Sequence, residues 1–434
     1  MNQLPVRKYA MGDSKMRRRL ALGAVLVAAA FSTAAYAEVE PEDMVRGRQA
    51  RKVEIQGIAK VEHHSNLART SAALAVTQNL KRGDTIYSPS LNVDALIPIG
   101  RQALFLNGSA SYLFHDANTR LDNSQINATA GIGNSIGPCG SVLSGNYTRS
   151  RSGLDDRVLL TTLDNLLSVK RASLGLTCTR PSGLGLIMSA SQVWGDNSIP
   201  VATNSDYRTS TASVGGQFGR ASVGSISVSG NYARTDYPNR DALLGESEGY
   251  EQIGGGVTLD RRIGGRIQAT ATLSYSNVEL LKQLVLPAGA PMDLRSKFSG
   301  LTYSARVTYR ASSRLQGGVN LDRSISPTIA TGKTYELQTN YAVQADYRIG
   351  SRIYLQASAR QSDSEVRGDS FLGVASPVNI LTDSRTRSVA GSLRYRQNDR
   401  LSLVLSGGYE QRRTNSPDLD YSSERIGLAA EFRY

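Results

Sequence analysis

The stretch YELQTNYAVQADY at residues 335–347 shows the pattern that decides the fold. One face of this stretch, drawn as an extended chain, carries Tyr335, Leu337, Tyr341, Val343, Ala345 and Tyr347. The other face carries Glu336, Gln338, Asn340, Gln344 and Asp346. Successive side chains of a strand point to opposite faces, so this period of two predicts a strand with one apolar and one polar face.

The same alternation continues along the chain, with eighteen such segments between residues 53 and 434. The connections alternate between short ones, such as 397–400, and long ones, such as 65–83, 279–296 and 365–383. Tight turns at one end and longer loops at the other are typical of outer-membrane barrels. The sequence therefore predicts an all-β fold, a transmembrane antiparallel up-and-down β-barrel of about 18 strands. An even strand number places both termini in the periplasm.

The N-terminal region indicates export. Residues 16–37, MRRRLALGAVLVAAAFSTAAYA, combine a basic start, an apolar core and an A-x-A site before Glu38. This is the pattern of a secretory signal peptide cleaved after Ala37, and Met16 is an alternative start. A short anchoring helix is the competing interpretation. The predicted organisation is a signal peptide at 1–37, a short periplasmic segment at 38–52 and the barrel at 53–434.

Composition excludes several classes of protein. The chain has 434 residues, 50 Lys and Arg against 37 Asp and Glu, and a net charge of +13. The basic residues are scattered among acids, so we expect no nucleic-acid partner. Two cysteines are too few for a disulfide-stapled scaffold. Beyond residue 37 no apolar run approaches the ~20 residues of a spanning helix.

The C-terminal segment ERIGLAAEFRY, 424–434, alternates in the same way. Ile426, Leu428, Phe432 and Tyr434 share the face that would meet lipid. A last strand that ends in aromatic residues resembles the signal read by the barrel-assembly machinery, with Phe432 and Tyr434 in the signal positions. Outer-membrane lipid and this machinery are therefore expected partners. The competing interpretation is the last strand of a soluble barrel.

Alternation also assigns residues to the lumen, which in a barrel of this size is an aqueous channel. The candidate lumen-lining residues are Arg262, Arg306, Arg310, Arg348, Arg360, Arg394, Arg396, Arg412, Arg425, Glu336, Asp346 and Glu410. Such a wall is hydrophilic with a basic excess, and charged rings bias which solutes pass. The alternative is that these side chains pair across strands and hold the shape of the barrel. An inward tyrosine such as Tyr354 could pack against sugar rings.

The cysteines and histidines were considered as site residues. Cys139 starts one predicted strand and Cys178 ends the next, on the same face and at the same end of a hairpin. A disulfide between them is predicted, and two free thiols are the alternative. His63 and His64 are neighbours on a strand and point to opposite faces, which makes a poor metal site. We expect no catalytic, cofactor or metal site.

The start of the predicted barrel resembles a known family. Residues 61–70, VEHHSNLART, contain Asn66, Arg69 and Thr70 after a strand that ends in polar residues. GDTIYSPSL at 83–91 and PIGRQALFLNGSASYLF at 98–114 follow. Together they resemble the outer-membrane β-barrel porin family associated with bacterial exopolysaccharide gene clusters. The resemblance is specific only over about 55–114, and His63-His64 replaces residues that are more often acidic in the family.

The resemblance implies a channel that exports a polysaccharide, with a periplasmic polysaccharide export protein as partner. Export of an exopolysaccharide or other surface polysaccharide is the leading hypothesis, and no nucleotide-binding motif is present to supply energy. The second hypothesis is a general or anion-preferring porin for small solutes. Its distinguishing feature would be a loop folded into the lumen, with 65–83, 279–296 and 365–383 as candidates. A surface adhesin or a barrel enzyme is the third.

Overall fold

The computed structural model describes residues 51–151, 165–220, 224–240, 248–281, 297–328, 333–369, 383–415 and 417–434. The predicted signal peptide at 1–37 lies outside the described residues, as does most of the predicted periplasmic segment.

The described residues include eighteen strands, the α-helix α2 and three 3₁₀ helices. The strands are β1 (Lys52–His64), β2 (Asp84–Ile99), β3 (Gln102–His115), β4 (Asn123–Ile136), β5 (Cys139–Arg151), β6 (Leu166–Thr179), β7 (Leu184–Asn197), β8 (Tyr207–Arg220), β9 (Gly224–Asp236), β10 (Gly249–Ile263), β11 (Ile267–Leu280), β12 (Phe298–Arg310), β13 (Leu315–Pro327), β14 (Lys333–Ile349), β15 (Ile353–Asp369), β16 (Asp383–Arg396), β17 (Leu401–Thr414) and β18 (Tyr421–Arg433). The helices are α2 (Ala72–Thr77), η1 (Thr119–Leu121), η2 (Pro200–Ser205) and η3 (Pro417–Leu419). Among the described residues, no helix is both long enough and apolar enough to cross a membrane.

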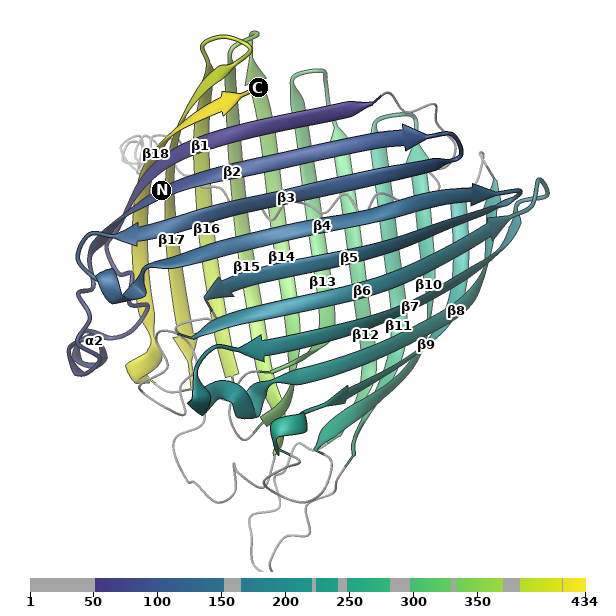
Figure 1. Cartoon of the computed structure of the whole chain (residues 1–434), viewed down its shortest axis with the longest axis horizontal. Helices are drawn as coiled ribbons and strands as arrows, with labels where there is room; N and C mark the ends of the chain where they lie inside the picture. The colour runs from purple at the N-terminus through teal and green to yellow at the C-terminus, as the bar shows by residue number, and fades with distance from the viewer. Residues whose placement is uncertain are drawn as a thin grey trace, which may run out of the picture.

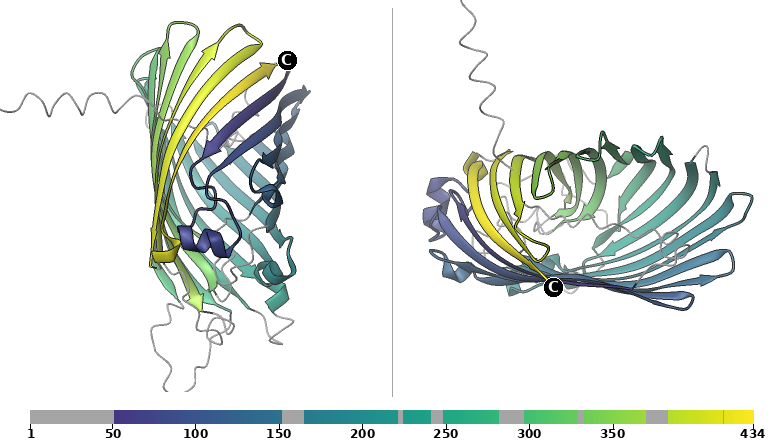
Figure 2. Two further views of the ribbon diagram at one scale, coloured as in Figure 1. Left: turned by 90° about the vertical axis from the view of Figure 1, so that its left-hand side faces the viewer. Right: turned by 90° about the horizontal axis from the view of Figure 1, so that it is seen from above.

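The strands form one closed antiparallel sheet. Each strand pairs with its neighbours in the sequence, and β1 closes the ring by pairing with both β2 and β18. Seen from above, the ring is a flattened oval (Figure 2). The seam is completed at the C-terminus, where the Tyr434 N–H donates to the Ile55 carbonyl at 2.8 Å. The predicted fold class is confirmed, including the number of strands.

The two ends of the barrel differ. The turns between β2 and β3 and between β16 and β17 belong to what we call the short-turn end, where the C-terminus also lies (Figure 1). The opposite long-loop end carries α2 and the 3₁₀ helices (Figure 1). Turn glycines such as Gly350, with φ +65°, adopt a conformation that side chains with a Cβ rarely adopt, which allows the tight reversals.

The outer face of the barrel is apolar. Large apolar side chains are exposed at alternate positions on strands all around the ring, and Val343 and Ile426 are 53% and 61% exposed. Tyr309, Tyr347 and Tyr395 are exposed on the same face beside the short turns. A continuous apolar wall edged with tyrosines matches a bilayer and its interface.

A disulfide joins β5 to β6. Cys139 and Cys178 lie opposite each other in the strand register, and the structure links their sulfur atoms. Both belong to the outward-facing set of their strands, together with Leu143 and Leu174. The bond ties the hairpin together at the short-turn end.

The assignment of faces predicts how a charge would be tolerated at two neighbouring residues of β14. Val343→Arg places a guanidinium against lipid and should lower the free energy of unfolding by about 2–4 kcal/mol. Gln344→Arg is the matched control, because Gln344 is exposed on the inner face of the same strand and should cost little. Urea titration in lipid vesicles measures both. Equal costs would contradict the assignment.

Candidate functional site in the lumen

The inner wall formed by β3 to β9 is mostly neutral and hydroxyl-rich. Its side chains pair across strands, as in Ser144 with Ser173 at 2.7 Å and Ser189 with Ser213 at 2.7 Å. Cross-strand hydroxyl pairs of this kind leave the wall uncharged and wettable. Arg171 is the charged exception among the inner positions of β6.

The inner wall from β10 to β18 carries the charge. All twelve predicted lumen-lining residues lie on the inward-facing positions of these strands, at the alternate positions to the exposed apolar side chains. The lumen therefore has one neutral wall and one charged wall, which face each other across the ring. Such an arrangement directs an electric field across the passage.

Among the described residues, Arg306 and Arg360 of this wall have no carboxylate partner. The Arg306 Nε donates to the Asn320 Oδ1 at 3.5 Å, and the Arg360 Nη2 donates to the Asn340 Oδ1 at 2.9 Å. Both side chains are exposed to the lumen. Contact with a neutral amide leaves the positive charge uncompensated, so this part of the wall attracts anions.

Two of the other predicted residues, Arg394 and Glu410, make structural contacts. Arg394 forms an ion pair with Glu431 at 3.0 Å, and nearby Arg433, on the same inner face, forms one with Glu54 at 2.8 Å. Glu410 accepts a hydrogen bond from the Tyr421 hydroxyl at 2.6 Å. These contacts link β16, β17, β18 and β1 around the seam, as the alternative interpretation of cross-strand pairing expects.

The remaining candidates differ in exposure. Arg262, Arg310 and Arg348 are exposed at the short-turn end, whereas Asp346 and Arg425 are half-buried. Arg412 points inward at the long-loop end but is only 4% exposed, so it borders no open passage. Glu336 accepts a hydrogen bond from the Ser364 hydroxyl.

The lumen is narrowed by a feature that the sequence analysis did not predict. The hydrogen-bonded ladder between β12 and β13 covers only residues 303–310 and 316–323. Beyond it β12 pairs with β11, and β13 continues with β14 alone. The wall is therefore split between β12 and β13 at the long-loop end.

Beyond the split, the end of the β13–β14 hairpin packs inside the barrel. Tyr335 and Leu337, on the outward-facing positions of β14, are 0% and 3% exposed. They form one apolar cluster with Tyr250, Val278 and Phe298, which are inward-facing residues of β10, β11 and β12. The outward-facing side of β14 can contact the inward-facing side of β10–β12 only if this part of β14 lies inside the ring. The hairpin end therefore occupies the lumen.

A buried tyrosine holds the two sides of this hairpin near Thr328 and Thr334. Tyr237, after β9, is fully buried and its hydroxyl donates to the Thr334 carbonyl at 2.6 Å. The same oxygen accepts from the Thr328 N–H at 3.2 Å. Burial raises the pKa of Tyr237 to about 12, which keeps the hydroxyl protonated.

A second contact lies beside the apolar cluster. The Arg367 guanidinium is 5.7 Å from the centre of the Phe298 ring.

The inward-folded hairpin end, residues 323–328 and 333–337, corrects two expectations. Tyr335 and Leu337 do not meet lipid, because the inner wall of β10–β12 covers their apolar face instead. Of the loops predicted to fold inward, 65–83 lies at the rim with α2 (Figure 1). Most of 279–296 and 365–383 lies outside the described residues. The sequence gives no sign that this segment is buried inside the barrel. Tyr335 and Leu337 continue the alternation of β14, and alternation alone places them on the lipid side.

The residues that carry the family resemblance hold the first long loop. The Asn66 side chain donates to the carbonyls of Thr70 at 3.1 Å and Ser422 at 3.2 Å. The Arg69 Nε lies 3.5 Å from the Glu410 Oε1 on β17. These contacts are structural, since they fix the loop against β17 and β18.

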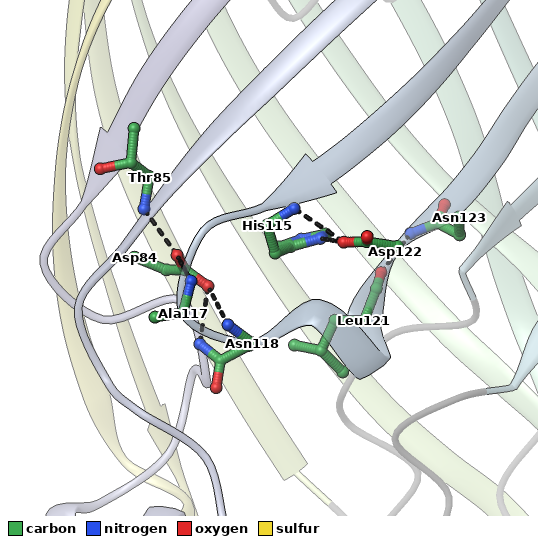
Figure 3. A network of polar contacts seen from close by, with 8 residues as sticks. All are labelled: Asp84, Thr85, His115, Ala117, Asn118, Leu121, Asp122 and Asn123. Atoms are coloured by element: carbon green, nitrogen blue, oxygen red, sulfur yellow. Dashed lines mark hydrogen bonds and ion pairs between the residues drawn. The ribbon is translucent and has the colours of Figure 1, made fainter.

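Asp84 ties this loop to the next one (Figure 3). Its carboxylate accepts from the backbone N–H groups of Thr85, Ala117 and Asn118, and from the Asn118 side chain, at 2.7–3.0 Å. Asp122 accepts from the His115 N–H at 2.7 Å in the same network (Figure 3). A carboxylate with several donors is strongly held, so the rim at β1–β4 is a rigid unit.

The neighbouring histidines lie on opposite faces of β1. His64 Nε2 is 2.6 Å from Glu62 Oε1, whereas His63 Nδ1 is 3.1 Å from Thr85 Oγ1. In the part of the chain that the structure describes, no three or more His, Cys, Asp or Glu side chains gather in a way that could hold a metal ion.

The chain is similar to known proteins only in comparisons with solved structures. No protein-family model matches the chain, and no curated protein matches it. The crystal structure of the outer membrane protein OpdK from Pseudomonas aeruginosa is 11% identical, with 88% of this chain and 99% of that chain covered and a TM-score of 0.41. A BenF-like porin from Pseudomonas fluorescens Pf-5 is 10% identical, with coverages of 88% and 99% and a TM-score of 0.45. Pseudomonas aeruginosa OccK2 in complex with glucuronate is 10% identical, with coverages of 88% and 98% and a TM-score of 0.43.

The geometry of this chain defines its class. Eighteen antiparallel strands close into a ring, the outer wall is apolar and edged with tyrosines, and the inner wall is hydrophilic. This is the architecture of an outer-membrane β-barrel.

The inward packing of the hairpin end can be tested by truncating its apolar contacts. Tyr335→Ala combined with Leu337→Ala should release the hairpin end, because each truncation of a buried side chain removes about 2–5 kcal/mol of stabilisation. Backbone amides of 333–338 should then exchange hydrogen faster, and single-channel conductance in planar bilayers should rise. Val343→Ala, on the lipid-exposed part of the same face, is the control. Unchanged exchange and conductance in the double variant would show that the hairpin end does not narrow the lumen.

Proposed function

We propose that this protein is a passive outer-membrane channel for small polar solutes, with a preference for anions. The observation that carries the proposal is the inward-folded hairpin end, residues 323–328 and 333–337, which narrows a hydrophilic lumen. A constriction inside a wet barrel restricts the size of what passes and leaves the passage open to water. This is the feature that distinguishes a small-solute porin from a wider conduit.

The charge of the lumen supports the preference for anions. Arg306 and Arg360 project from neighbouring parts of one wall and contact only amide oxygens. The facing wall of β3–β9 offers hydroxyl groups that can replace water around a moving solute. Uncompensated cations lining a pore raise the local concentration of anions and lower that of cations.

We further propose that the short-turn end faces the periplasm. The C-terminal Tyr434 and the start of β1 lie together at this end, joined by the Tyr434 N–H. Barrels of this type carry short turns on the periplasmic side and longer loops outside. The anchored rim at β1–β4 and the end of the β13–β14 hairpin then belong to the external mouth.

Polysaccharide export, the leading hypothesis from the resemblance, stays a prediction. Asn66 and Arg69, two of the residues that carry the resemblance, anchor a loop at the rim. The narrowing by the hairpin end favours solutes smaller than a sugar polymer. A clean deletion strain, complemented with the wild-type gene, would decide this prediction, since loss of external polymer with precursor held in the periplasm would establish an export role.

The selectivity can be tested by reversing the lumen charge. In planar bilayers with a KCl gradient, the wild-type reversal potential should show preference for chloride. Arg306→Glu with Arg360→Glu should move the reversal potential to the opposite sign, because two uncompensated cations become anions in the same part of the lumen.

The control for this experiment is Arg208→Glu, which makes one such Arg-to-Glu exchange at an exposed position on the outward-facing set of β8. It should leave the preference for chloride unchanged. A wild-type channel that prefers potassium, or a double variant as anion-selective as the wild type, would overturn the assignment. Absence of any conductance from correctly folded protein would overturn the channel itself.

A further inference from the structure

Four turns at the short-turn end share a sequence pattern. An arginine at the end of one strand is followed four residues later by an arginine at the start of the next. The strand-end arginines are Arg262, Arg310, Arg348 and Arg396. The turn arginines are Arg266, Arg314, Arg352 and Arg400. In three of the turns a tyrosine comes just before the first arginine, so the tyrosine faces lipid and the arginine faces the lumen.

The backbone links these turns into a row. The Arg348 N–H donates to the Arg314 carbonyl at 2.8 Å, and the Arg396 N–H donates to the Arg352 carbonyl at 2.7 Å. The Arg433 N–H continues the row to the Arg400 carbonyl at 2.8 Å. At the short-turn end, the part of the lumen mouth formed by β10–β18 is therefore bordered by arginine residues. The four turns contain one acidic residue, Asp399.

The last turn of the row borders a cavity of about 200 Å³ at the mouth. Its lining includes Arg394, Arg396, Arg400 and Arg433, against the carboxylates of Glu431 and Asp399. The lining therefore carries two more positive than negative charges. Tyr354 and inward-facing polar side chains complete it.

Some of the arginines that line the cavity form ion pairs, and others do not. Arg394 is paired with Glu431, and Arg433 is paired with Glu54 outside the cavity lining. Arg396 donates to the Tyr354 hydroxyl at 2.8 Å and to the Ser351 carbonyl at 3.2 Å, both neutral acceptors. Arg400 is exposed and its guanidinium contacts no carboxylate within the described residues. Two guanidinium groups thus remain to bind an anion.

Both of these arginines are held in position. The Asn398 side chain accepts from the backbone N–H groups of Arg400 and Leu401 at 2.8 Å, which fixes the turn that presents Arg400. The guanidinium carbons of Arg396 and Arg348 lie 5.6 Å and 5.8 Å from the centre of the Tyr354 ring. The hydrogen bond to the Tyr354 hydroxyl orients Arg396, and Arg348 brings a further positive charge near the cavity.

We propose that this cavity is a binding site for a small organic dianion, carrying two carboxylates or one phosphate monoester. The two charges of such a ligand match Arg396 and Arg400, whose forked donors suit both groups. The proposal deepens the anion preference proposed above and rests on it for its physiological role. A site at this mouth would concentrate dianions at one end of the channel.

Isothermal titration of the full-length protein in detergent tests the site, with succinate, glycerol 3-phosphate and acetate as probes. We expect saturable one-to-one binding of succinate, of glycerol 3-phosphate, or of both, and weaker binding of acetate by about tenfold or more, since acetate satisfies one guanidinium only. The two dianions distinguish a carboxylate site from a phosphate site. Acetate binding as tightly as either dianion, or no saturable binding of any probe, would overturn the proposal.

Two variants locate the site. Arg400→Gln should weaken dianion binding by about tenfold or more without affecting folding, because the side chain is exposed. Arg180→Gln is the matched control, since Arg180 is an exposed arginine of the β6–β7 turn on the facing wall. It should bind as the wild type does. Equal weakening in both variants would indicate a general effect of charge and overturn the assignment to this cavity.

This titration does not depend on current through the channel. Binding without any conductance would contradict the proposed function and leave the dianion site standing. Conductance with preference for chloride but no saturable binding would contradict the site and leave the channel standing.

Discussion

The hydrogen-bonded ladder between β1 and β18 is the contact on which the rest of this structure depends. It joins residues 56–64 to 425–433 and converts an open sheet of eighteen strands into a ring. Inside a bilayer no water is available to satisfy an unpaired backbone N–H or C=O group, so only a closed barrel can leave no edge. Closure also creates the lumen, and with it the difference between an apolar outer face and a polar inner face.

The split between β12 and β13 is a local departure from this rule. It is confined to the long-loop end, where the ladder stops at residues 303 and 323. The freed hairpin end compensates by burying Tyr335 and Leu337 against the inner wall and by bonding to the Tyr237 hydroxyl. Tyr335 and Leu337 thus contact the inner wall in place of lipid, and this contact places the hairpin end in the lumen. The lumen is therefore narrowed because the ladder between β12 and β13 ends early.

The charged wall divides into two parts with different roles. Around the seam, pairs such as Arg394 with Glu431 hold β1 and β16–β18 in register. On β12 and β15, Arg306 and Arg360 meet only amides, so their charges act on whatever enters the lumen. Cross-strand pairing thus accounts for some of the inward arginines, and the proposed preference for anions rests on others. The neutral hydroxyl wall opposite makes the imbalance effective, because it supplies no counter-charges.

Alternation along the chain was enough to predict the fold class, a barrel of about 18 strands and the inward side of all twelve lumen candidates. Such a prediction is possible because alternation is a local property of the strand. An apolar residue such as Val343 is expected on the lipid side, and a polar residue such as Gln344 on the lumen side. Only the tertiary structure decided that Tyr335 and Leu337 turn away from lipid, that Arg394 is paired while Arg306 is not, and that Arg396 and Arg400 border one cavity. These outcomes depend on which strands meet across the ring and where a ladder stops. Both are set by contacts between segments far apart in the chain, which no local pattern records.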